Sequence, residues 1–180
     1  MRKVQGEVKK LDFKDYIRNI PDFPKTGILF RDITTLLKDR KAFRLAVDAL
    51  VDKYKSKKID AVVAVEARGF ILGGAIAHKL NAGFIPVRKK GKLPAKTNSV
   101  TYALEYGTGT LEMHHDALKP GDRILIVDDL LATGGTVRAV TELAKQQKAK
   151  IIGIVFLIEL TELKGRDKLK DYPVHSLIKY

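Results

Sequence analysis

Apolar positions follow two different spacings along this chain. Runs of consecutive aliphatic residues, which are typical of strands buried on both faces, occur at 60–65, 83–87, 123–127 and 150–159. Between these runs, apolar residues recur at helical spacing over 41–55, 70–80 and 137–147. Strands that alternate with helices predict an α/β fold, in which helices flank a mainly parallel, twisted sheet and the crossovers are right-handed.

Other segments depart from this alternation. Residues 12–19 predict a short amphipathic helix, and residues 20–34, with two prolines and a glycine, predict a rigid irregular segment. Alternating positions from 97 to 113 predict a small β-hairpin hood that stands off the main sheet, and 173–180 predicts a last edge strand. A length of 180 residues fits one domain, 1–180.

The run at 123–127 leads into the richest candidate site. It ends at Asp128 and Asp129, and a loop of small residues, 132–136, separates these acids from the next predicted helix. Small residues let backbone N–H groups approach a phosphate, threonine adds hydroxyl donors, and the helix N-terminus adds partial positive charge. Ionised carboxylates only accept hydrogen bonds, so they suit sugar hydroxyls or Mg²⁺ rather than the phosphate itself. The combination predicts a ribose 5-phosphate site, whereas a bare Gly-Gly-Thr would favour an ordinary capped turn.

The sequence of this loop carries a resemblance to a known family. The stretch Val127-Asp-Asp-Leu-Leu-Ala-Thr-Gly-Gly-Thr136 resembles the phosphoribosyl diphosphate-binding motif of the type I phosphoribosyltransferases, and its Leu-Leu-Ala resembles the adenine phosphoribosyltransferases in particular. The resemblance implies that ribose 5-phosphate is transferred from 5-phosphoribosyl 1-diphosphate to adenine, giving AMP and diphosphate in purine salvage. The residues expected to bind the ribose and its 5-phosphate are Asp128, Asp129, Ala132, Thr133, Gly134, Gly135 and Thr136.

Cations follow two neighbouring strands of the predicted sheet. Arg68 comes after 60–65, and the cluster Arg88-Lys-Lys-Gly-Lys92 comes after 83–87. Carboxyl ends of parallel strands meet at one edge of a sheet, so these side chains are expected near the same ligand. The residues expected to bind the diphosphate are Arg68, Arg88, Lys89 and Lys92, with Glu66 as a salt-bridging or metal-organising partner of Arg68. In the family, the peptide bond that matches Glu66–Ala67 is often cis. Cations of the matching basic cluster can reach across a dimer interface in the family, which implies a homodimer here.

The base and the reacting centre are assigned through the resemblance. The segment from Phe23 to Thr34 resembles the family's adenine-binding segment, so residues 1–35 are expected to contribute the base site. The residues expected around adenine are Leu29, Phe30, Arg31 and Leu160, with the base stacked on Phe30. Residues 94–113 resemble the mobile catalytic hairpin, in which Glu105 is expected to act with Arg68 in catalysis and Tyr106 to cover the centre. From the residues alone, a loop packed on the core and an exposed hairpin acid remain the favoured interpretations.

Composition limits the alternatives. The absence of cysteine removes disulfides and thiolate metal sites, and no run reaches membrane-spanning length or forms a signal peptide, so a cytoplasmic protein with no membrane partner is expected. His114 and His115 are adjacent on a predicted strand and point to opposite faces, which argues against a zinc site. The expected cofactor is Mg²⁺, held mainly through the substrate and not in a dedicated protein cage.

Two rival functions remain open, and the net charge of +13 suggests the second of them. One is a phosphoribosyltransferase for a 6-oxopurine, which would need a donor for the 6-oxo group. The other is a non-catalytic regulator that binds nucleic acid through its basic surface. Most lysines fall on helix faces and chain ends, and no helix-turn-helix domain is present, so no nucleic-acid partner is expected.

The chain departs from the family pattern at the end of the helix that follows the phosphate loop. Glycine usually ends this helix in the family, whereas this chain has Lys148.

Overall fold

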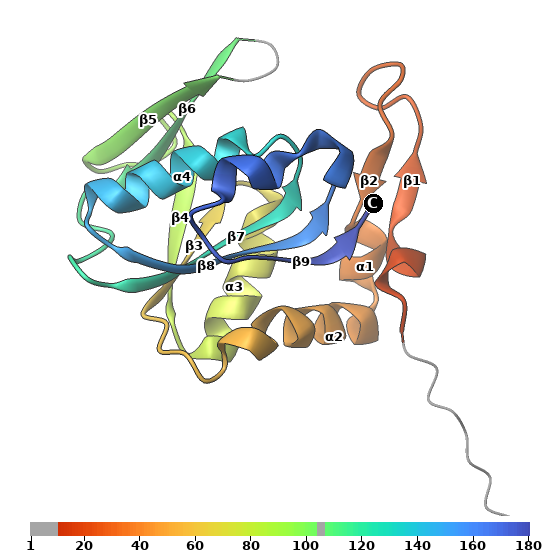
Figure 1. Cartoon of the computed structure of the whole chain (residues 1–180), viewed down its shortest axis with the longest axis horizontal. Helices are drawn as coiled ribbons and strands as arrows, with labels where there is room; N and C mark the ends of the chain where they lie inside the picture. Colours follow the sequence, from red (N-terminus) through yellow and green to blue (C-terminus); the bar gives the residue numbers. More distant parts are fainter. Residues whose placement is uncertain (1–10, 104–106) are drawn as a thin grey trace, which may run out of the picture. The chain divides into compact units, whose positions relative to one another are not determined.

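The computed structural model describes residues 11–103 and 107–180. The chain divides into two compact units, Met1–Ala46 and Val47–Tyr180. The larger unit contains a seven-stranded sheet with the strand order β5-β6-β4-β3-β7-β8-β9 (Figure 1). Its parallel part consists of β3 (Ala61–Val65), β4 (Gly83–Lys89), β7 (Arg123–Leu131), β8 (Lys150–Glu159) and β9 (Val174–Lys179). The predicted α/β class, the parallel sheet and the final edge strand are therefore confirmed.

Two helices cover the two faces of this sheet. Side chains alternate between the faces along β3, so Val63 and Ala64 point in opposite directions. Val63 belongs to the same core cluster as Val140 and Leu143 of α4 (Gly135–Gln146). Ala64 lies against Gly73 of α3 (Arg68–Leu80), so close that a Cβ atom on Gly73 would stand 2.5 Å from the Ala64 Cβ atom. The carboxyl ends of β3, β4 and β7 thus lead into a common edge that carries the beginnings of α3 and α4.

The predicted hairpin is present and is joined to the sheet. It consists of β5 (Thr97–Ala103) and β6 (Thr108–His114), which pair antiparallel from Thr97 opposite His114 to Ala103 opposite Thr108. β6 also pairs with the end of β4, where Arg88 lies opposite Glu112 and Lys89 opposite Leu111. The hairpin therefore continues the sheet at the edge that carries the basic cluster. Glu105 and Tyr106 lie outside the described residues.

The smaller unit corrects two of the sequence-based expectations. The helix expected over 12–19 is a single 3-10 turn, Phe13–Tyr16, and β1 (Arg18–Ile20) follows it. The segment expected to be irregular contains β2 (Phe30–Asp32), which pairs antiparallel with β1. Cross-strand polar contacts explain the pairing, since Arg18 Nε donates to Asp32 at 3.0 Å and Arg31 Nη1 donates to Asn19 at 2.5 Å. Only residues 21–29 between the strands form an irregular turn.

The remaining elements are short or connect the units. The smaller unit also holds α1 (Thr34–Lys38), and α2 (Arg40–Val51) begins there and ends in the larger unit. The described part of the larger unit also contains the 3-10 segments Asp52–Tyr54, Thr161–Leu163 and Gly165–Leu169. Among the helices of the described ranges, none combines the length and the apolar character that a membrane span requires.

Candidate active site

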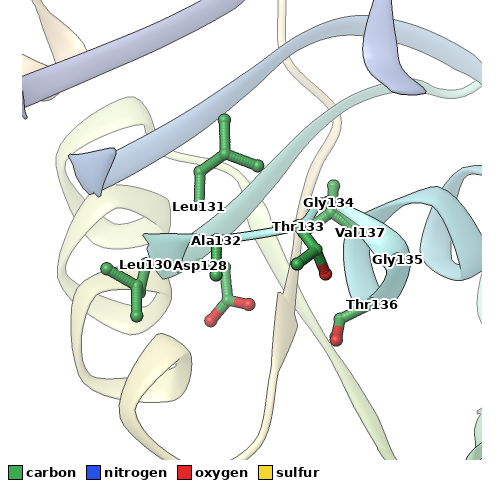
Figure 2. A pocket seen from close by; sticks show the side chains of 9 residues that line it. All are labelled: Asp128, Leu130, Leu131, Ala132, Thr133, Gly134, Gly135, Thr136 and Val137. Carbon is green, nitrogen blue, oxygen red and sulfur yellow. The ribbon is translucent and has the colours of Figure 1, made fainter. Parts of the chain in front are cut away.

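The junction of β7 and α4 forms a pocket in the larger unit. Its lining consists of Asp128 and residues 130–137, and its cavity volume is about 70 Å³ (Figure 2). β7 is longer than the sequence predicted, because it continues to Leu131, which is buried and pairs with Glu159 of β8. The two aspartates therefore lie within the strand and not at its end. The phosphate loop, Ala132 to Thr136, turns the chain from this strand into the helix.

Donor groups on the phosphate loop face one side. In Figure 2 the hydroxyls of Thr133 and Thr136 and the carboxylate of Asp128 point to the same side, whereas the side chain of Leu131 points away. Gly134 precedes the helix with φ +77° and provides no side-chain cap for the first-turn N–H groups of α4. These N–H groups and the positive end of the helix dipole suit a phosphate. The loop can therefore bind an anion while Asp128 accepts hydroxyl groups beside it.

The adjacent aspartates have different environments. Asp129 is buried, and its Oδ2 atom lies 2.8 Å from Arg68 Nη2 in an ion pair that is not an aligned hydrogen bond. Asp128 is half-buried, and its Oδ1 atom accepts the N–H of Asp129 at 2.9 Å. A Cβ atom on Gly69, at the start of α3, would lie 2.8 Å from Oδ1 of Asp128, so a larger residue there would displace this carboxylate. The structure thus brings Asp128, and not Asp129, into the pocket lining.

The electrostatics of this pair favour protonation or a bound cation. Burial raises the pKa of Asp128 well above its usual value, and the charge of Asp129 raises it further. Burial also raises the pKa of Asp129, while the Arg68 guanidinium acts in the opposite direction. A carboxylate in this setting is stabilised by a hard cation that a phosphorylated substrate brings with it. Within residues 11–103 and 107–180, no group of three or more His, Cys, Asp or Glu side chains could hold a metal by itself.

The carboxylate of Glu66 holds the start of the basic cluster in place. Glu66 was expected to pair with Arg68, but it accepts Nε of Arg88 at 2.7 Å and the N–H of Lys89 at 2.9 Å. Burial acts to raise the pKa of Glu66, yet these two donors hold it below its usual value. Arg88 Nη1 also donates to the carbonyl oxygen of Lys92 at 3.1 Å. Arg88 is therefore engaged in shaping the loop, while the side chains of Lys89 and Lys92 are exposed. The Glu66–Ala67 peptide bond is cis.

Glu112 is a site-shaping residue that sequence reasoning missed. It is buried on β6, and its Oε2 atom accepts the N–H of Gly91, which has φ +78° at the tip of the basic loop. Its place next to Arg88 in the strand register explains this reach. Sequence alternation offered no signal for it, because a charged residue between Leu111 and Met113 is what a strand with one solvated face predicts.

The end of β5 next to the hairpin turn also reaches the phosphate loop. The hydroxyl of Thr136 makes a long contact of 3.4 Å with the Tyr102 hydroxyl, and a Cβ atom on Gly135 would lie 3.5 Å from the carbonyl oxygen of Ala103. The described end of β5 therefore lies directly beside the start of α4. Glu105 and Tyr106 follow this point in the chain, and their expected roles stay predictions.

The residues expected around adenine lie in both units. Leu29, Phe30 and Arg31 belong to the smaller unit, where the Phe30 ring makes a T-shaped contact with Phe23 at a centroid distance of 5.1 Å. Leu160 belongs to the larger unit, where its N–H donates to the carbonyl oxygen of Leu131 at 2.9 Å, next to the phosphate loop. Their contacts with a base stay predictions, as does direct contact of Asp129 with the ribose.

Comparisons with known proteins identify the family of this chain. A family model described as phosphoribosyl transferase domain matches residues 32–179. The adenine phosphoribosyltransferase of Brachyspira hyodysenteriae is 58% identical over 170 residues, which covers 94% of this chain and 100% of that protein. The crystal structure of the Thermoanaerobacter pseudethanolicus adenine phosphoribosyltransferase superimposes with a TM-score of 0.90 at 52% identity and covers 93% of this chain and 98% of that one.

A ligand-bound structure is also similar. The Saccharomyces cerevisiae adenine phosphoribosyltransferase, complexed with an imino-altritol bisphosphate and adenine, has a TM-score of 0.87 at 40% identity, over 92% of this chain and 96% of that one. Fold, loop sequence and full-length similarity therefore agree, and this chain belongs to the phosphoribosyltransferase family, among the adenine phosphoribosyltransferases.

Proposed function

We propose that the protein transfers ribose 5-phosphate from 5-phosphoribosyl 1-diphosphate to adenine, giving AMP and diphosphate in purine salvage. One observation carries the proposal. The carboxylate of Asp128 and the hydroxyls of Thr133 and Thr136 face the same side of a loop that ends at the N-terminus of α4 (Figure 2). Acceptors for sugar hydroxyls thus lie next to donors for a phosphate, and the two together match a ribose 5-phosphate group.

The roles of the acidic pair differ in this proposal. Asp128 lines the pocket and accepts the ribose hydroxyls. Asp129 is buried against Arg68, so it acts on the substrate by orienting that guanidinium for the diphosphate. The 5-phosphate binds the backbone and hydroxyl donors of the phosphate loop, Ala132 to Thr136.

The diphosphate is the leaving group, and the cations of the neighbouring strand ends stabilise it. Arg68, Lys89 and Lys92 provide charge, while Arg88 keeps the basic loop in shape through Glu66 and the Lys92 carbonyl. Mg²⁺, bound chiefly through phosphate oxygens with Asp128 nearby, would supply further neutralisation of the diphosphate. As the bond from the anomeric carbon to the diphosphate oxygen breaks, positive charge develops on the sugar and negative charge on the leaving group, so positioned cations lower the barrier.

The base completes the reaction. N9 of adenine forms the new bond to the anomeric carbon and loses its proton, and we assign the acceptance of that proton to Glu105. Phe30 offers an aromatic face for the purine, and Leu160 offers an apolar wall. Tyr106 would cover the centre and exclude water, which would otherwise hydrolyse the activated ribose.

A homodimer in the cytoplasm is part of the proposal. Ile71 of α3 and Phe84 of β4 are large apolar side chains that are 46% and 39% exposed, and Phe84 makes a T-shaped contact with Phe70. Exposed apolar side chains on the adjacent elements α3 and β4 suit a second copy of the chain. Sedimentation of the purified protein checks this assignment, and a monomer at micromolar concentration would contradict it.

The function is tested by diphosphate release. The full chain is assayed with adenine, 5-phosphoribosyl 1-diphosphate and Mg²⁺, with each component omitted in turn, and then with hypoxanthine, guanine or xanthine in place of adenine. Release that requires adenine and the phosphoribosyl donor is expected, with AMP as the second product. Turnover of a 6-oxopurine but not of adenine would overturn the choice of base, and the absence of turnover with any purine would overturn the assigned reaction.

A further inference from the structure

The segment that follows β8 lies directly against the phosphate loop. In this supporting segment, residues 161–169, the backbone of Gly165 faces Ala132 and Gly134. A Cβ atom on Gly165 would overlap the carbonyl oxygen of Ala132 and stand 2.9 Å from the nitrogen of Gly134, and a Cβ atom on Gly134 would overlap the carbonyl oxygen of Gly165. Backbone therefore meets backbone with no side chain between them, so a shift of the supporting segment moves the loop.

One arginine fixes the supporting segment to the sheet. The segment is built from short 3-10 turns, Thr161–Leu163 and Gly165–Leu169, which have little stability of their own. Arg166 forms a two-pronged ion pair with Glu159 at the end of β8, with Nε to Oε1 at 2.9 Å and Nη2 to Oε2 at 2.5 Å. Its Nη1 atom donates to the carbonyl oxygen of Val174 in β9 at 2.9 Å. One guanidinium thus ties the residue after Gly165 to two strands.

Glu159 is buried, and the hydrogen bonds from Arg166 hold its pKa below its usual value although burial acts to raise it. The pair therefore stays charged. The Arg166 side chain is 40% exposed, so the ion pair contributes little net stability, but its planar, two-pronged geometry fixes orientation. Neither residue lines the phosphate-loop pocket.

We propose that the Glu159–Arg166 ion pair is a positioning device for the 5-phosphate site, which acts through the backbone contact of Gly165 with the phosphate loop. The inference rests on the proposed function, because it assigns the ligand of that loop as a 5-phosphate. Binding groups must be held to within about 0.5 Å of the productive geometry, and a displacement of about 1 Å costs on the order of a hundredfold in rate. The pair holds the loop from behind without touching the substrate.

The test uses Arg166→Lys and Gly165→Ala. The lysine keeps the charge and loses the planar fork, whereas the alanine keeps both residues of the ion pair and pushes against Ala132 directly. For both variants we expect the KM for 5-phosphoribosyl 1-diphosphate and the Kd for ribose 5-phosphate to rise about tenfold or more. The KM for adenine and the Kd for diphosphate should change less than about threefold, which corresponds to less than about 0.7 kcal/mol. Lys170→Gln is the matched control, since its exposed side chain lies 3.7 Å from Asp167 just beyond the supporting segment.

The possible outcomes separate the inference from the function. Variants with a lower melting temperature or a smaller active fraction, but with wild-type KM and Kd values, would show a merely structural role and overturn the inference. A general loss of affinity for adenine, diphosphate and ribose 5-phosphate alike would overturn it as well. Wild-type protein that neither binds ribose 5-phosphate nor turns over adenine would overturn the proposed function itself.

Discussion

Arg68 Nη2 lies 2.8 Å from Oδ2 of Asp129, and this ion pair divides the work of two adjacent aspartates. The charge of Asp129 is compensated inside the protein, where the side chain is buried. Asp128 has no comparable ion pair among the described residues and lines the pocket. The charge of Asp129 is balanced without substrate, whereas we expect the charge of Asp128 to be balanced only when a ligand binds. Substitutions at the two positions should therefore have different effects.

Replacing Asp128 with asparagine should stabilise the substrate-free protein while it reduces activity. The folded-state pKa of Asp128 is raised above an unfolded value of about 3.9, so the folded protein retains a proton that the unfolded chain has lost. The free energy of unfolding therefore falls as the pH rises from the unfolded pKa of Asp128 toward its higher folded-state pKa. The Asp128→Asn substitution removes the effect, so we expect a higher melting temperature at pH 7.5, by about 2–4 °C for each kcal/mol, and a gain that vanishes toward pH 4.

The activity of the same variant should fall. A charged acceptor is worth about 1.5–3 kcal/mol, so kcat/KM for 5-phosphoribosyl 1-diphosphate should drop roughly tenfold to a hundredfold. Thermal unfolding from pH 4 to 8 and initial rates measure the two effects, with the exposed Asp116→Asn as the control. A variant that is less stable than wild type at every pH would contradict the assigned electrostatics.

Replacing Arg68 with glutamine should destabilise the protein, because it leaves the Asp129 carboxylate buried and uncompensated. Breaking such a pair costs about 3–5 kcal/mol, and the value should lie at the lower end because the Arg68 side chain is 34% exposed. The double variant Arg68→Gln/Asp129→Asn should recover most of this loss without recovering activity. Urea unfolding measures both, and Lys55→Gln, which breaks the exposed pair with Asp52, should change stability by less than about 0.5 kcal/mol. Equal loss in the single and double variants would show that the pair is not the cause.

The parallel sheet could be predicted because buried strands need unbroken aliphatic runs. β3 and β8 lie within one residue of their predicted bounds, and the pocket lies at the predicted strand-to-helix turn. The extension of β7 through Asp128 to Leu131 could not be read from the sequence, because carboxylates are poor strand formers and the pairing with β8 that overrides this preference is a long-range contact.

The pairing of charged side chains could not be predicted from the sequence. Glu66 is two residues from Arg68 in the sequence, yet it binds Arg88, which the neighbouring strand β4 brings to it. The register between β4 and β6 places Glu112 under the basic loop, and the register is set by side chains along the whole hairpin. In the smaller unit, the pairing of β1 with β2 depends on Arg18 and Asp32, which are 14 positions apart. The local spacing of apolar and polar residues does not predict such long-range contacts.

Replacing Gly73 with alanine should weaken the packing of α3 on the sheet. The new Cβ atom would lie 2.5 Å from the Ala64 Cβ atom and 3.0 Å from Cε2 of Phe84, so the helix would have to move away from β3. Overpacking of this kind costs about 1–3 kcal/mol. Adding Ala64→Gly removes the atom that collides, so the double variant should be more stable than the sum of the two single losses predicts. Denaturant unfolding of the wild type, the two single variants and the double variant measures this double-mutant cycle. Strictly additive losses would show that the two positions are not in contact.

Replacing Lys148 with glycine should stabilise the protein. Lys148 has φ +58° where α4 ends, and the N–H of Ala149 donates back to the carbonyl oxygen of Ala144 at 3.1 Å, as in a Schellman motif. A residue with a Cβ atom pays about 1–2 kcal/mol for this conformation, and glycine relieves that strain although its greater freedom in the unfolded chain offsets part of the gain. We expect a net gain of about 0.5–1 kcal/mol in urea unfolding with unchanged kcat/KM. Lys148→Ala is the matched control, since it removes the charge and keeps the Cβ atom, and it should leave stability within about 0.5 kcal/mol. If alanine stabilised the protein as much as glycine, relief of charge repulsion on this basic surface would be the cause instead of the backbone angle.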